Sequence, residues 1–128
     1  MPPILPSLVT GLALLLYMLL SLNVARARGR YGVAAPATAG DPAFDRVFRV
    51  QQNTLEQLVV FVPGLWLFSI FVSPAWGPAI GFLWLLARIF YAWSYYRDPA
   101  SRGPGFVVSA ICNVVLIIGS IGGMLRAF

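Results

Sequence analysis

Three polar residues with helical spacing, Arg49, Asn53 and Glu56, stand where an apolar run of the chain begins. They occupy positions i, i+4 and i+7, so a helix would carry a cation, an amide and an anion on one face. Ionisable groups are expensive inside a bilayer and commonly mark a functional site there. We therefore predict a binding site for a charged small molecule on this face. A hydrated helix end with local salt bridges is the alternative interpretation.

A second polar group, Arg88, Tyr91 and Tyr95, follows at positions i, i+3 and i+7. A helix would place this guanidinium and the two phenols on one face. An interfacial aromatic belt accounts for the tyrosines but not for the arginine. Counted from the ends of their predicted helices, Arg88 and Glu56 lie at similar depths in antiparallel helices. We expect them to form a buried ion pair at the floor of the site.

The elements that carry these residues are predicted to be membrane helices. Of the 128 residues, 59% are hydrophobic and 10% are charged, which is too apolar for a soluble domain of this length. Only helices satisfy their own backbone over such lengths in lipid. The sequence therefore predicts one domain, residues 1–128, that is an all-α membrane protein with a four-transmembrane-helix bundle. The helices are expected at about 4–25, 44–72, 77–96 and 106–128.

The basic residues predict how the chain is oriented. All nine are arginine, and most fall between the first and second or the third and fourth predicted helices. The positive-inside rule then puts these segments in the cytoplasm and both termini outside. The first helix has no basic residues before it, so we interpret it as a retained helix rather than a cleaved signal peptide. A bacterial inner membrane is the expected location, with the site facing the cytoplasm.

The segment Arg26–Asp45 is expected to be a loop long enough to fold over the site.

Several kinds of chemistry are not expected. The chain has no histidine, one cysteine and four acidic residues that are scattered along it, so no metal site is predicted. Cys112 is expected to be a buried structural thiol because nothing basic lies near it in the sequence. The net charge of +5 comes from arginines of the kind that flank membrane helices, so nucleic acid binding is not expected either. The use of arginine alone suits recognition of a small anion, and an arginine-rich genome is the alternative explanation.

Two stretches carry a family resemblance, Phe44–Glu56 and Ala87–Arg97, together with Arg102. Their pattern resembles the MAPEG family, the membrane-associated proteins in eicosanoid and glutathione metabolism, which include leukotriene C4 synthase and the microsomal glutathione transferases. The similarity extends in order over almost the whole chain. It implies a homotrimer in the lipid bilayer that binds glutathione, as co-substrate, at each interface between protomers.

The resemblance also implies roles for individual residues. Arg102 would face the glutathione sulfur as the catalytic residue. Arg88 joins the predicted glutathione-binding residues only as the floor of the site, from the spacing argument above. A peptide with two carboxylates and one ammonium needs several guanidiniums and one carboxylate, which agrees with this set. One departure is Gln57, where leukotriene C4 synthase has a tyrosine, so one phenol contact is expected to be missing. The remaining implied glutathione ligands are Arg28, Arg49, Gln51, Asn53, Glu56, Tyr91 and Tyr95.

The implied function is that of an integral membrane glutathione transferase, which activates the thiol for conjugation to a lipophilic electrophile. Glutathione peroxidase activity is compatible with the same site. A non-catalytic lipid- or glutathione-binding member of the family is the main alternative. A small multidrug transporter is a weaker one, because its membrane glutamate lies in the first helix, and Ile4–Ala25 carries no charge here.

Overall fold

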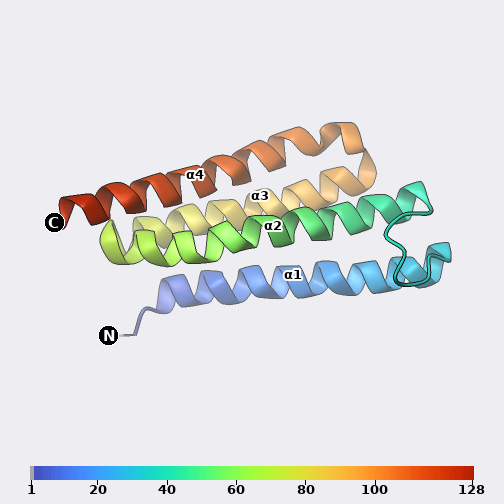
Figure 1. Ribbon diagram of the computed structural model, residues 1–128, viewed down its shortest axis with the longest axis horizontal. Coiled ribbons are helices and arrows are strands. Elements are labelled where there is room, and N and C mark those ends of the chain that lie inside the picture. Colours follow the sequence, from blue (N-terminus) through green and yellow to red (C-terminus); the bar gives the residue numbers. More distant parts are fainter. Residues whose placement is uncertain (1) are drawn as a thin grey trace.

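The computed structural model describes residues 2–128 as a bundle of four long helices (Figure 1). Met1, part of the predicted domain, lies outside the described residues. The predicted all-α, four-helix architecture is confirmed. The elements are α1 (Ile4–Tyr31), α2 (Pro42–Phe71), α3 (Trp76–Arg97), the short 3₁₀ helix η1 (Pro99–Arg102) and α4 (Gly103–Arg126).

The helices run up and down, so both termini lie at the same end of the bundle (Figure 1). The helix α2 packs against each of the other three long helices, and α1 packs against α2 and α3. The end opposite the termini holds the α1–α2 connection and η1, and therefore gathers most of the arginines. Polar groups from α2, α3 and the start of α4 can meet there.

Local signals explain where the helices begin and end. The Asp41 carboxylate caps α2 by accepting from the backbone N–H of Ala43 at 2.8 Å, and Pro42 follows at the first helical position. Asp98 accepts from the N–H of Ala100 in the same way at the start of η1. Gly32 ends α1 with a left-handed φ of 68°, which favours glycine.

The predicted boundary of the first helix was wrong. The helix does not stop near residue 25 but continues to Tyr31, because alanine and arginine are good helix formers and the first strong stop signal is Gly32. The predicted long loop Arg26–Asp45 is therefore reduced to a short connection between α1 and α2. Arg26, Arg28 and Arg30 therefore lie on α1 and not on a loop that could fold over the site.

Three segments of residues 2–128 are long and apolar enough to cross a membrane, namely Ile4–Tyr31, Pro42–Phe71 and Pro99–Arg126. The helix α3 is not among them, and it contains Arg88 together with several tryptophans and tyrosines. Many leucines, isoleucines and valines on the outer faces of the bundle are exposed. Such surfaces are typical of proteins covered by lipid or by neighbouring subunits.

The centre of the bundle is packed around two aromatic rings. Phe61 of α2 stacks on Trp84 of α3 with ring centroids 3.8 Å apart, and both are fully buried with Leu65 and Leu116. Glycines at the start of α3 and near the end of α4 allow the helices to approach each other closely. A Cβ built on Gly119, for example, would lie 2.6 Å from the ring of Phe68.

Replacing Gly105 with alanine is expected to destabilise the protein by about 1–3 kcal/mol. A Cβ at this position would lie 2.8 Å from the backbone of Tyr91, so α4 could not approach α3 as closely. Thermal unfolding in detergent measures the effect. Gly122→Ala is the matched control on the same helix, because a Cβ there has nothing within 4 Å. Equal unfolding temperatures for the two variants would contradict the close approach.

Candidate functional site

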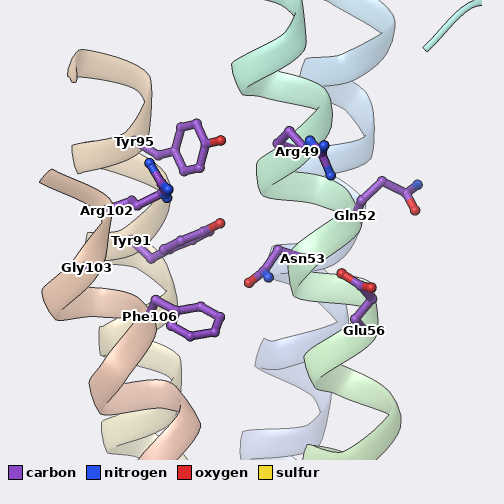
Figure 2. A pocket seen from close by; sticks show the side chains of 9 residues that line it. All are labelled: Arg49, Gln52, Asn53, Glu56, Tyr91, Tyr95, Arg102, Gly103 and Phe106. Atoms are coloured by element: carbon purple, nitrogen blue, oxygen red, sulfur yellow. The ribbon is translucent and has the colours of Figure 1, made fainter. Parts of the chain in front are cut away.

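A cavity of about 510 Å³ opens on the side of the bundle, at the arginine-rich end. One wall is a face of α2, and the other is built by α3, η1 and the first turn of α4 (Figure 2). The polar groups that line it come from segments far apart in the sequence. The lining residues are Arg49, Gln52, Asn53, Glu56, Tyr91, Tyr95, Arg102, Gly103 and Phe106.

The α2 wall carries the first polar group found in the sequence. Arg49, Asn53 and Glu56 line the cavity together, as their helical spacing predicts. Gln52 also lines the cavity. It was not among the predicted ligands, although it occupies position i+3 of the same face. The complete face therefore follows the i, i+3, i+4, i+7 pattern, and this periodicity was the signal that could have identified Gln52.

The opposite wall combines two phenols with a guanidinium. The rings of Tyr91 and Tyr95 meet edge to face with centroids 5.6 Å apart. The Arg102 guanidinium lies 5.7 Å from the Tyr95 ring, and its Nη1 donates to the carbonyl oxygen of Pro99 at 2.8 Å. Figure 2 shows these three side chains facing α2 across the cavity. Phe106 adds an apolar surface below them, and no motif in the sequence predicts this role.

The charged residues of the cavity are accessible. Arg49, Glu56 and Arg102 are all exposed in the protomer, so their charges are available to a ligand. Two guanidiniums and one carboxylate leave the cavity with an excess of positive charge. An anionic molecule that also carries one cationic group matches this arrangement.

The predicted ion pair between Arg88 and Glu56 is not formed. Arg88 is fully buried and donates to Asn53 Oδ1 at 2.7 Å, Thr54 Oγ1 at 2.9 Å and Ser109 Oγ at 3.1 Å. The physical reason is the helical period. Thr54 faces the bundle interior, and a residue two positions later lies about 200° further around α2, which turns Glu56 outward. Arg88 therefore lies behind the cavity wall instead of forming its floor.

Two further predicted ligands, Arg28 and Gln51, do not line this cavity. Arg28 Nη1 donates to the carbonyl oxygens of Val33 at 3.3 Å and Ala37 at 2.7 Å, and its guanidinium lies over the Phe44 ring. It therefore holds the connection between α1 and α2 in place. Gln51 Nε2 donates to Ser21 Oγ of α1 at 3.1 Å. Both residues lie on the α1 side of the protomer.

Gln57 does not leave a gap in the cavity. Its Oε1 accepts from Trp84 Nε1 at 3.2 Å and from Asn113 Nδ2 at 2.9 Å, so the side chain points into the bundle.

The neighbouring Cys112 is buried and free, as predicted for a structural thiol. Within residues 2–128 no group of histidine, cysteine, aspartate or glutamate side chains is arranged to hold a metal ion.

Comparison with known proteins places the chain in one family. The model of the MAPEG family matches residues 6–122. An uncharacterized protein of Synechocystis sp. is 49% identical over 91% of this chain and 85% of its own length. Human microsomal glutathione S-transferase 2 is 33% identical over 80% of this chain and 70% of its own length. Leukotriene C4 synthase of Cavia porcellus is 33% identical over 94% of this chain and 80% of its own length.

Proposed function

Because this chain belongs to the MAPEG family, we propose that it is an integral membrane glutathione transferase. It activates the glutathione thiol for conjugation to a lipophilic electrophile. The observation that carries the proposal is the charge pattern of the cavity, which is lined by two guanidiniums, Arg49 and Arg102, and by one carboxylate, Glu56. Glutathione has two carboxylates and one ammonium, which complement these groups.

The chemistry depends on stabilising a thiolate. The sulfur attacks the electrophilic carbon with an electron pair, the leaving group departs with the pair of the broken bond, and the thiol proton passes to water. A guanidinium stays protonated at neutral pH, so Arg102 acts as a fixed positive charge and not as a base. Its position on η1, in the wall of the cavity, allows it to face the sulfur.

We further propose that the active form is a homotrimer. The ligands implied by the family fall into two sets, because Arg28 and Gln51 lie on the α1 side while Arg49, Asn53 and Glu56 line the cavity. In a ring of identical subunits, one face of each protomer meets the other face of its neighbour. The α1 side of one protomer would then complete the cavity of the next. The size of the purified complex in detergent, measured by light scattering, tests this arrangement.

All four long helices are proposed to cross the membrane, with the cavity at the cytoplasmic side. The helix α3 runs antiparallel between segments that are apolar enough to span, so it must cross with them. Arginines concentrate at the end of the bundle opposite the termini. A reporter that is active only outside the cytoplasm is therefore expected to be active when fused after Phe128. Activity only of a cytoplasmic reporter at that position would reverse the topology.

A conjugation assay tests the proposed activity. The purified protein, with glutathione and a chromogenic aryl halide, is expected to form the thioether faster than the uncatalysed reaction. S-methylglutathione has no thiol and is expected to inhibit by occupying the same cavity. A protein that binds glutathione but gives no rate enhancement with any of several aryl halides and activated alkenes would favour the non-catalytic alternative.

A further inference from the structure

The buried Arg88 determines more than the stability of the bundle. Building on the proposed function, we propose that Arg88 is a positioning residue that fixes the Asn53 amide with its NH₂ group toward the cavity. Position 53 then donates a hydrogen bond and selects an oxygen acceptor, either a carboxylate or a carbonyl group of glutathione. Arg88 itself does not touch the ligand.

Three neutral oxygens hold the Arg88 guanidinium in one place. They belong to Asn53 and Thr54 of α2 and to Ser109 of α4, at 2.7 to 3.1 Å, and the side chain has 0% exposure. The Ser109 hydroxyl uses its own proton to donate to the carbonyl oxygen of Phe106 at 2.9 Å, which leaves its lone pairs for Arg88. A guanidinium that is bound to two helices from a third has little freedom to rotate.

The chemistry of the guanidinium decides which way the Asn53 amide points. Arginine has only donors, so the amide atom that faces it must be the oxygen. Reversing the amide would bring two donors together and leave one N–H of the buried Arg88 Nη2 without an acceptor, which is costly. The NH₂ group must therefore point away from Arg88. Within residues 2–128 this NH₂ group makes no hydrogen bond and is not buried. Asn53 itself lines the cavity.

The same guanidinium also supports the opposite wall. It lies 4.0 Å from the centroid of the Tyr91 ring, and Tyr91 lines the cavity. One buried side chain thus contacts a lining residue of α2 and a lining residue of α3. Because all three hydrogen-bond partners are neutral, the positive charge behind the wall is not cancelled by an ion pair with them. This positive charge favours a negatively charged ligand oxygen as the acceptor for the Asn53 NH₂ group.

Asn53→Asp tests the orientation without removing Arg88. The new carboxylate can still accept from Arg88, so the protein is expected to remain folded, with an unfolding temperature at least equal to that of the parent. An oxygen now faces the cavity where the NH₂ group was, and glutathione binding is expected to weaken at least about 10-fold. Gln52→Glu is the matched control, because it adds the same charge to the same wall without contacting Arg88. It is expected to weaken binding clearly less.

A double-mutant cycle tests whether Arg88 acts through Asn53. Arg88→Met and Asn53→Ala are each expected to weaken glutathione binding. The double variant is expected to bind no more weakly than the weaker-binding single variant, because both substitutions remove the same hydrogen-bond donor. Additive losses would overturn the positioning role, as would an Asn53→Asp protein that binds like the parent. A parent that does not bind glutathione would instead overturn the proposed function, and this inference with it. If Arg88→Met does not fold, the comparison of Asn53→Asp with Gln52→Glu still tests the proposed orientation of the Asn53 amide, and equal binding by these two variants would overturn it.

Discussion

Replacing Arg102 with alanine is expected to lower the conjugation rate at neutral pH by roughly 100-fold, the usual effect of removing one group that stabilises a developing anion. The Arg102 guanidinium in the cavity wall favours the thiolate and so lowers the pKa of the bound glutathione thiol. Without it the thiol pKa rises, and the pH–rate profile moves to higher pH. Affinity for glutathione is expected to change little, because Arg49 and Glu56 remain in the cavity.

Arg97→Ala is the matched control for this experiment. Arg97 is an exposed arginine at the same end of the bundle, but it lies over the Trp93 ring and outside the cavity. It is expected to keep the parent pH profile. If Arg102→Ala keeps full activity and an unchanged pH profile, Arg102 is an anchor for lipid phosphates and not the residue of catalysis.

Replacing Glu56 with glutamine is expected to weaken glutathione binding by about 10- to 100-fold while the oligomer stays intact. Glu56 is the one carboxylate among the residues that line the cavity, and it is not engaged with Arg88. Its charge is therefore available for the ammonium of the ligand. Glutamine has the same size but lacks the charge, so the effect isolates the electrostatic contribution. Titration calorimetry of the two proteins measures it.

Asp45→Asn is the control for Glu56→Gln. Asp45 lies on the same helix, outside the cavity, where its Oδ1 accepts from the backbone N–H of Gly40. Asparagine keeps an oxygen for this bond, so glutathione affinity is expected to remain that of the parent. Equal affinity in the Glu56→Gln and parent proteins would mean that Glu56 is structural and that the ligand lies elsewhere.

The sequence predicted the polar face of α2 because spacing along a helix fixes which side chains share a face. Arg49, Asn53 and Glu56 needed only the helical period to be placed together. The same reasoning failed for Arg88. Counting residues along the predicted helices placed Arg88 beside α2, but a position along a helix does not reveal the rotation of one helix against another. That rotation turns Arg88 toward Thr54 and Ser109 and turns Glu56 outward.

The two ends of the α1–α2 connection illustrate a similar limit. Asp41 followed by Pro42 is a helix start that sequence rules describe well. The end of α1 was harder to predict because arginines suggested the edge of the membrane, and the helix continues beyond the apolar run until Gly32. Membrane boundaries and helix boundaries are set by different physics, hydration in one case and backbone conformation in the other.

Whether this cavity binds glutathione is tested most directly by calorimetric titration of the purified protein with glutathione, beside the same titration of Glu56→Gln. We expect saturable binding to the parent with one glutathione per protomer, and binding to the variant that is weaker by about 10-fold or more. Absence of saturable heat with the parent, in a preparation shown to be folded and oligomeric, would contradict the assignment of this cavity to glutathione.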